Sequence, residues 1–220
     1  MHFIQHNGKE RMSSETEKFI LRTTLTSPFG FKTRLAVEVL GLGDRVTVAT
    51  NVDVNDANDP LRRQNPLGKI PCLVRADGTG IYDSGVILEF LQHVAGTDRL
   101  LPAHGPGRFP AFSRVRLIDG IIDAAIQLLY EERWHEPQAR SVPWMAYQRG
   151  KVERGLAALE AAPPDPRQTD AIAIGLACAL EFFDRRKPVV WRPDCPRLVE
   201  WFEAFRANEA AFDRTRPPLT

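Results

Sequence analysis

The period of the hydrophobic pattern changes at Ser27-Pro28, and this change determines the first elements of the fold. Upstream of it, apolar and polar residues alternate, which predicts a strand with one face less polar than the other. The less polar positions are Phe19, Leu21, Thr23 and Leu25. Pro28 interrupts this strand because it has no amide hydrogen, but its fixed φ suits the first turn of a helix. The predicted helix ends at Gly41-Leu42-Gly43 and a second strand follows over residues 46–52, so the order indicates a βαβ unit.

A second set of short elements follows the turn-rich connection of residues 55–67. Pro71 opens a third strand over residues 70–74, and residues 76–80 carry a tight hairpin signal before a fourth strand at residues 81–82. The next helix is predicted to have Ser84 as its N-cap, with Asp83 just before it. The order βαβ followed by ββα predicts a compact α/β domain over residues 18–96.

The rest of the chain is predicted to be helical. Residues 97–110 shift in composition toward Gly, Pro and His, which marks a linker between domains. Helices are predicted over residues 111–135, 142–161 and 171–186 and from Pro196 onward, so residues 111–220 form an all-helical domain. Residues 1–17 are polar and without an apolar segment, so we expect a disordered or tag-like extension rather than a secretory signal, and Met12 is an alternative start.

The composition excludes several kinds of function. The 29 basic and 28 acidic side chains nearly cancel, so no strong basic field exists to hold nucleic acid or an anionic membrane. The cysteines at positions 72, 178 and 195 are expected to be buried free thiols in a reducing cytoplasm. The five histidines are scattered, and the one i, i+4 pair, His2 and His6, lies in the polar N-terminal extension, so we expect no metal site.

Ser27 stands where a thiol-handling site is normally built. A helix N-terminus directs amide hydrogens and a partial positive charge at the preceding loop, and both favour a thiolate over a thiol. Cysteines at positions 27 and 30 would indicate a redox C-x-x-C motif, but Ser27 and Gly30 occupy them. A hydroxyl can donate a hydrogen bond to a thiolate that a substrate brings. Serine is also a common N-cap, so the pattern leaves two interpretations of Ser27 open.

Two other loops carry the same kind of ambiguity. Pro71 is either an ordinary edge-strand proline or a cis-proline that leaves the backbone N–H and C=O of Ile70 available to an extended peptide. Asp83 and Ser84 either only start a helix or hold the end of an α-amino acid. In that second interpretation Asp83 pairs with the ammonium, and Ser84 and its amide bind the carboxylate.

Taken together, five segments give the chain a family resemblance. They are Ser27-Pro28-Phe29, Asn65-Pro66-Leu67-Gly68-Lys69-Ile70-Pro71, Asp83-Ser84, Asp119-Gly120-Ile121-Ile122-Asp123-Ala124-Ala125 and Arg214-Thr215-Arg216-Pro217-Pro218. From about Lys18 onward the chain resembles the glutathione transferase superfamily, and within it small bacterial proteins that bear Ser-Pro-Phe. The resemblance implies a thioredoxin-like α/β N-terminal domain that binds glutathione, an all-α C-terminal domain and a homodimer.

The resemblance also implies roles for individual residues. Ser27 matches the position that activates the thiolate, and Ile70 before a cis-Pro71 matches the backbone clamp on the glutathione cysteine. Asp83 and Ser84 match the γ-glutamyl site. Lys69 lies near the glycyl end, and Phe29 belongs to the same glutathione-binding loop.

Two departures from the family pattern stand out. The core helix begins with Asp170 and has Ala173 in the third place, so only half of its usual capping box is present. Gly30 adds flexibility just past the nucleophile loop, so we expect it to loosen Ser27.

The resemblance therefore predicts a cytoplasmic glutathione S-transferase, an enzyme that presents the glutathione thiolate to a small electrophile without a metal. Phe29, Tyr130 and Trp134 are candidates to line the electrophile pocket, with packing in the core as the alternative. Two other functions stay open on the same fold: a non-catalytic glutathione-binding or scaffolding protein, and a glutathione-dependent isomerase or dehalogenase.

Overall fold

The computed structural model describes residues 17–218, and the chain folds into two compact units. One unit ends at Asp98 and takes in the chain end from Pro217, and the other spans Arg99–Arg216. The expected extension lies outside the described residues up to position 16. No helix among the described residues is long and apolar enough to cross a membrane.

The first unit is built on a four-stranded sheet with the order β2-β1-β3-β4. The strands are β1 (Phe19–Arg22), β2 (Val46–Ala49), β3 (Cys72–Val74) and β4 (Gly80–Ile81). β1 pairs with β2 in parallel and with β3 antiparallel, and β3 pairs with β4 antiparallel. The predicted βαβ-ββα order is therefore confirmed as a thioredoxin-like sheet, with strands shorter than the sequence pattern suggested.

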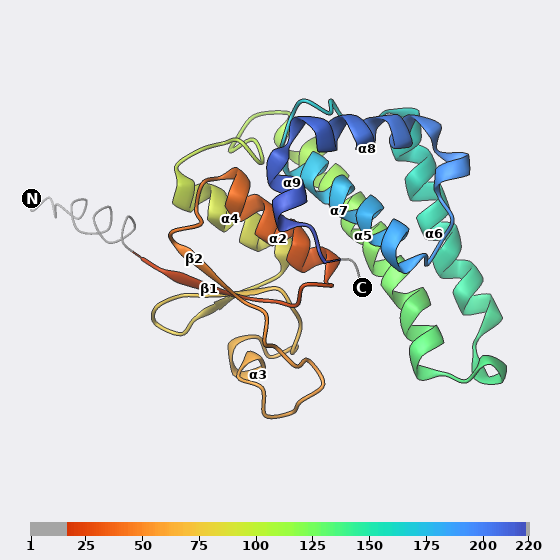
Figure 1. The fold of residues 1–220 in the computed structure, drawn as a ribbon, viewed down its shortest axis with the longest axis horizontal. Helices are drawn as coiled ribbons and strands as arrows, with labels where there is room; N and C mark the ends of the chain where they lie inside the picture. Colours follow the sequence, from red (N-terminus) through yellow and green to blue (C-terminus); the bar gives the residue numbers. More distant parts are fainter. Residues whose placement is uncertain (1–16, 219–220) are drawn as a thin grey trace, which may run out of the picture. The chain divides into compact units, whose positions relative to one another are not determined.

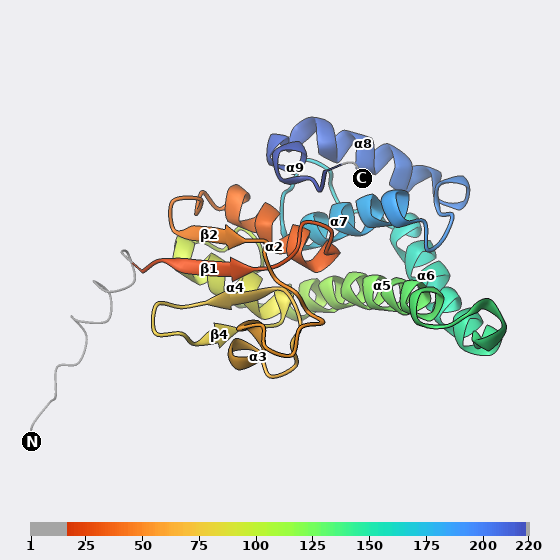
Figure 2. The ribbon, with the colours of Figure 1, turned by 60° about the horizontal axis from the view of Figure 1, so that its bottom comes forward.

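Two helices pack against the sheet, α2 (Pro28–Val39) and α4 (Ser84–Ala95), while the short α3 (Leu61–Gln64) lies near the opposite face (Figures 1 and 2). The alternation of β1 explains this arrangement, because Phe19 and Leu21 are buried whereas Ile20 is 46% exposed. The Phe19 ring meets Phe90 of α4 edge to face, at 5.4 Å between ring centroids. The core of this unit thus lies between the sheet and the two long helices.

The second unit is helical, as predicted. Its elements are α5 (Arg108–Trp134), η1 (Pro137–Ala139), α6 (Val142–Ala161), α7 (Ala171–Arg186), η2 (Arg192–Asp194), α8 (Pro196–Asn208) and α9 (Ala210–Thr215). Asp170 caps α7 as predicted, because its carboxylate accepts a hydrogen bond from the Ala173 amide at 2.8 Å. α5 and α6 approach closely at Gly155, where an added Cβ would lie 2.5 Å from Ile121 Cγ1.

Glu17, which the sequence pattern assigned to the extension, belongs to the first unit. Its carboxylate accepts hydrogen bonds from Arg75 at 2.9 and 3.1 Å, and its carbonyl accepts one from Arg45 at 3.3 Å. The folded part of the chain therefore includes Glu17, one residue earlier than the predicted boundary.

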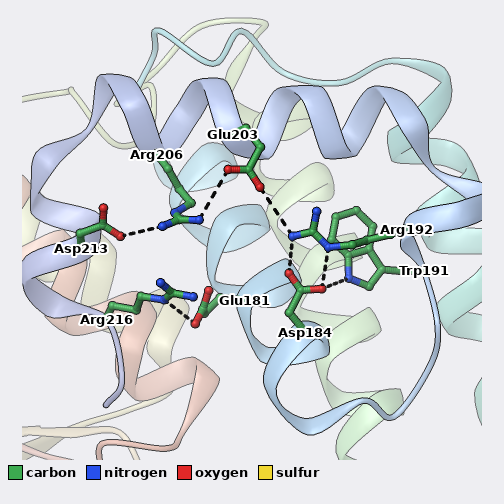
Figure 3. Close-up of polar contacts among 8 residues, drawn as sticks. All are labelled: Glu181, Asp184, Trp191, Arg192, Glu203, Arg206, Asp213 and Arg216. Atoms are coloured by element: carbon green, nitrogen blue, oxygen red, sulfur yellow. Dashed lines mark hydrogen bonds and ion pairs between the residues drawn. The ribbon is translucent and has the colours of Figure 1, made fainter. Parts of the chain in front are cut away.

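A network of ion pairs connects the last helices of the second unit (Figure 3). Arg192 pairs with Asp184 and Glu203, and Arg206 pairs with Glu203 and Asp213. A separate pair joins Arg216 to Glu181, whose side chain is only 1% exposed. These contacts hold α8, α9 and Arg216 against α7.

Candidate functional site

The sheet register brings the three motif loops to one end of the sheet. Arg22 at the end of β1 is opposite Cys72 at the start of β3, and Leu73 is opposite Ile81 at the end of β4. The loops that leave β1, enter β3 and leave β4 therefore share one edge. Ser27, Pro71 and Asp83 lie on these loops, so the topology gathers the predicted site residues of the first unit.

Ser27 is the N-cap of α2. Its Oγ accepts a hydrogen bond from the Gly30 amide at 3.1 Å, and its carbonyl accepts one from the Phe31 amide at 2.8 Å. The capping interpretation is thus confirmed. It does not exclude the other interpretation, because a hydroxyl that accepts at one lone pair still has its own hydrogen to donate. Ser27 is half-buried, so that hydrogen lies at a helix N-terminus within reach of solvent.

Gly30 does not loosen this loop, contrary to the sequence-based expectation. It is buried in the first turn of α2, where an added Cβ would lie 1.8 Å from Thr23 Oγ1 and 3.2 Å from Ser27 Cβ. Glycine is required here because the helix start packs directly on the end of β1. The missing side chain therefore tightens the Ser27 loop.

Arg34 holds the same loop from the next turn of α2. Its guanidinium donates to the carbonyls of Thr24 at 3.1 Å and Leu25 at 3.3 Å, and the residue is only 6% exposed. The path of the chain between β1 and Ser27 is thereby anchored to the helix that Ser27 caps.

The loop that enters β3 is closed by Asn65, which is 1% exposed. Its side-chain amide donates to the Lys69 carbonyl at 2.8 Å, and its Oδ1 accepts from the Leu67 amide at 3.1 Å. Gly68 completes the turn at φ 61°, a left-handed conformation that glycine adopts without a steric penalty. The Ile70–Pro71 bond is cis, as predicted, and none of the backbone hydrogen bonds of loops and turns between residues 17 and 218 involves Ile70.

Asp59 fixes the segment that leads into this loop. Its carboxylate accepts hydrogen bonds from the Leu61 amide at 2.7 Å, the Asp53 amide at 2.9 Å and the Arg22 guanidinium at 3.2 Å. These bonds, first of all the one from Leu61, hold the pKa of Asp59 below its ordinary value. The connection of residues 50–64 is thus tied to the end of β1.

Asp83, not Ser84, caps α4, which corrects the predicted cap. The Asp83 Oδ1 accepts from the amides of Gly85 at 2.9 Å and Val86 at 3.2 Å, and Ser84 is the first helical residue. Both residues are good N-caps, and the extended backbone at Asp83 decides between them. Asp83 is exposed and Ser84 is buried, so the carboxylate faces the solvent side of the helix start. The peptide bond before Asp83 is also cis.

Cys72 lies beneath the site but cannot serve as its nucleophile. The residue is fully buried, and burial raises its pKa to about 11 although the charge of Arg22 acts in the opposite direction. At neutral pH the side chain therefore stays a thiol. All three cysteines are free and buried, as predicted. A reactive thiolate at this edge of the sheet has to come from a ligand.

The other predicted site residues differ in how exposed they are and in the unit to which they belong. The side chain of Lys69 is exposed, and Phe29 is half-buried with Lys32 Nζ at 5.5 Å from its ring centroid. Tyr130 and Trp134 lie one turn apart on α5 in the second unit, where they are 47% and 61% exposed. Their exposure rules out the alternative of core packing. Among residues 17–218 no group of three His, Cys, Asp or Glu side chains is placed to hold a metal ion.

Three residues of the site were not assigned a role from sequence: Arg34, Asp59 and Asn65. Only Asn65 carried a usable signal, because an asparagine before Pro-x-Gly often accepts from the amide two residues on, as it does here from Leu67. Arg34 and Asp59 act through contacts that the sequence pattern does not contain.

Comparisons with known proteins agree with this geometry. The family described as "Glutathione S-transferase, N-terminal domain" matches residues 26–94. An uncharacterized GST-like protein of Escherichia coli K12, YibF, is 34% identical over 203 residues, which cover 88% of this chain and 96% of that protein.

Two solved structures also match over most of the chain. A glutathione transferase family member from Pseudomonas fluorescens Pf-5 with bound glutathione has a TM-score of 0.84 at 34% identity and covers 91% of this chain and 100% of its own. A glutathione S-transferase from Methylobacillus flagellatus with glutathione bound has a TM-score of 0.80 at 28% identity, with coverage of 91% and 100%.

Proposed function

This chain belongs to the glutathione S-transferase superfamily, and we propose that it is a transferase of the bacterial Ser-Pro-Phe type, which activates the glutathione thiolate for attack on a small electrophile. The observation that carries the proposal is the Ser27 hydroxyl at the N-cap of α2. It accepts from the Gly30 amide and keeps its hydrogen for a thiolate that arrives at the helix N-terminus.

The energy that this arrangement has to supply is modest. Lowering a thiol pKa from about 8.5 by ~2 units requires ~2.7 kcal/mol of differential stabilisation. One hydrogen bond to a charged group contributes about 1.5–3 kcal/mol, and the helix N-terminus adds about 0.3–1 kcal/mol. The two effects together are of the right size, so the proposed reaction does not call for a metal.

The rest of glutathione would be held by the other two loops. The backbone of Ile70 before Pro71 would pair with the cysteinyl group like an added strand, and Lys69 and Phe29 are assigned to the rest of the peptide. Asp83 pairs with the γ-glutamyl ammonium, since a carboxylate has a second oxygen besides the Oδ1 that caps the helix. Ser84 and its amide, in the first turn of α4, bind the γ-glutamyl carboxylate.

Rate acceleration in this proposal comes from bringing the two reactants together as well as from the thiolate. Tyr130 and Trp134 are assigned to the electrophile, because they are exposed aromatic side chains on one face of α5. In solution the protein is proposed to be a cytoplasmic homodimer. Exposed aromatic residues of α6, Trp144 at 43% and Tyr147 at 57%, support a partner surface, and sedimentation at micromolar concentration tests it.

One set of measurements tests the proposal. Glutathione is titrated into the protein by calorimetry, and the ultraviolet absorbance of the bound thiolate is followed as the pH is lowered. We expect binding and a thiolate that persists to about pH 6–7. Product analysis with a panel of electrophiles then separates the alternatives. A conjugate supports a transferase, a converted substrate with glutathione returned unchanged indicates an isomerase or dehalogenase, and binding without thiolate or turnover indicates a scaffold.

A further inference from the structure

Asn65 uses all of its polar groups inside one turn. Its backbone amide donates to the Leu61 carbonyl at 2.7 Å, and its backbone carbonyl accepts from the Gly68 amide at 2.8 Å. The side-chain amide donates to the Lys69 carbonyl at 2.8 Å while Oδ1 accepts from the Leu67 amide at 3.1 Å. The orientation of the side-chain amide is unambiguous, because one neighbour can only accept and the other can only donate.

The hydrogen bond from Asn65 to the Lys69 carbonyl also determines the direction of the Ile70 N–H. The Lys69 carbonyl and the Ile70 amide belong to one planar peptide unit, which is trans because the cis bonds are those before Pro71 and Asp83. In a trans unit the C=O and N–H point in opposite directions. Since Asn65 draws the carbonyl to its own side, the Ile70 N–H is directed away from Asn65 and out of the turn.

From this geometry we propose that Asn65 is a positioning residue, which orients the Ile70 N–H for the backbone of a bound thiol peptide. The inference rests on the proposed function, because it names what holds the clamp that glutathione would use. Asn65 itself does not touch the ligand. It is buried, and it acts through the rigid peptide plane between Lys69 and Ile70.

The test uses two variants that differ in charge. Asn65→Asp keeps the oxygen that accepts from the Leu67 amide and replaces the donor to the Lys69 carbonyl by a second oxygen. Asn65→Ser brings no charge; its hydroxyl can still accept from the Leu67 amide, more weakly, but is too short to donate to the Lys69 carbonyl. At about pH 8 we expect both variants to bind glutathione and S-methylglutathione three- to tenfold more weakly than the unaltered chain. The two ligands should be affected equally, because the Ile70 amide contacts the peptide and not the sulfur.

A pH series gives a readout that a purely structural role would not produce. When the introduced carboxyl of Asn65→Asp is protonated, its O–H can again donate to the Lys69 carbonyl. The affinity of Asn65→Asp relative to the unaltered chain should therefore recover as the pH falls to about 5, whereas that of Asn65→Ser should not. The charged side chains nearest in sequence, Arg62, Arg63 and Lys69, are exposed, and the adjoining elements contribute Arg22, Asp59 and Cys72. All six groups are present in the unaltered chain and in Asn65→Ser, which therefore record their background.

Kinetics and a control variant complete the test. Both substitutions should raise KM for glutathione and leave kcat nearly unchanged, because the lost contact is made equally in the ground and transition states. Leu91→Ala, which opens a cavity in the buried core beside α4, lowers stability without touching the turn and should keep the glutathione affinity. If the folded Asn65 variants bound glutathione as tightly as the unaltered chain, this inference would fail while the proposed function would stand. The same would follow if Leu91→Ala lost as much glutathione affinity as the Asn65 variants. Failure of the unaltered chain to bind glutathione would overturn the proposed function and this inference with it.

Discussion

The Ser27 hydroxyl caps α2 and, in the proposed reaction, also donates to the thiolate, so its replacement should affect stability and rate separately. Ser27→Ala removes a charge-assisted hydrogen bond of about 1.5–3 kcal/mol, which corresponds to a roughly ten- to hundredfold lower kcat. The lost bond to the Gly30 amide costs ~1 kcal/mol of stability in addition. Steady-state kinetics and urea unfolding on the same variant measure both effects.

Two matched variants separate these effects. Ser27→Thr keeps a hydroxyl and a cap and should retain most of the rate. Ser141→Ala removes an equivalent cap, the Ser141 Oγ that accepts from the Trp144 amide at 3.4 Å in α6. It should lower stability by a similar amount at full activity. If kcat for Ser27→Ala were as high as that for Ser141→Ala, the thiolate would be stabilised by Thr26 or by backbone amides and not by Ser27.

Asp83 also combines a helix cap with a proposed ligand contact, and here asparagine is the useful replacement. Asp83→Asn keeps an oxygen for the amides of Gly85 and Val86 and removes the charge that would pair with the γ-glutamyl ammonium. We expect KM for glutathione to rise about thirty- to a hundredfold, equivalent to roughly 2–3 kcal/mol, with little change in kcat or melting temperature. Calorimetric titration checks the affinity. Unaltered affinity in Asp83→Asn, with lowered stability in Asp83→Ala, would leave Asp83 as a cap only.

Cys72 gives the protein a predicted instability at alkaline pH. Burial raises its pKa to about 11 from an ordinary value of 9.0, so the unfolded chain loses this proton at lower pH than the folded chain. Between those two values the folded state holds more protons, and stability must fall as the pH rises. One such group contributes a slope of about 1.4 kcal/mol per pH unit. Urea unfolding from about pH 8 to pH 10.5 should show this slope, reduced in Cys72→Ala. An identical slope in that variant would contradict the prediction.

At the level of elements, the contact between the start of α2 and the end of β1 depends on Gly30. Gly30→Ala would place a Cβ 1.8 Å from Thr23 Oγ1, so the helix has to move and overpacking should cost about 1–3 kcal/mol. Because the same shift displaces Ser27, activity should fall with stability. The double variant Gly30→Ala/Thr23→Ala removes the clashing oxygen and should recover part of both. Additive losses in this double-mutant cycle, measured by urea unfolding, would show that the contact is not the cause.

The elements differ in how well the sequence predicts them, for reasons that specific residues show. The predicted bounds of α6 and α7 agree with the structure, because Ser141 and Asp170 are strong caps that lie next to regular apolar patterns. The strands are shorter than predicted, since alternation continues past the last ladder bond. The cap of α4 was misassigned because two adjacent residues suit the role.

The candidate site was likewise predictable only where the signal is local in the sequence. Its loops were predictable from Ser27, Pro71 and Asp83, which mark element boundaries in the sequence itself. The contacts that hold the loops were not, because Arg22 and Asp59 are 37 residues apart and meet only through the sheet. Gly30 was misread for the same reason: its neighbour Thr23 lies across the β1–α2 connection.

At the scale of the whole molecule, the end of the helical unit is secured by a buried ion pair. Glu181, in the middle of α7, accepts from Arg216 Nε at 2.7 Å, and its side chain is 1% exposed (Figure 3). Its second oxygen has no hydrogen-bond partner among the described residues. Arg216 is therefore the compensating charge for a carboxylate that has no access to water. The pair between Arg206 and Asp213, also in Figure 3, is different because Asp213 is 57% exposed.

This difference predicts unequal effects for two substitutions in neighbouring ion pairs. Arg216→Met leaves the Glu181 carboxylate buried and uncompensated, which should cost about 3–5 kcal/mol of stability. Asp213→Asn breaks an exposed pair and should cost less than about 1 kcal/mol. The double variant Arg216→Met/Glu181→Leu removes both buried charges and should recover most of the loss, since an apolar pair of similar volume avoids the desolvation cost. Urea unfolding of the three variants gives the free energies directly. If Arg216→Met were no more harmful than Asp213→Asn, the end of the helical unit would not depend on this pair, and the contacts of Phe212 with Phe202 and Phe205 would contribute more to holding α9.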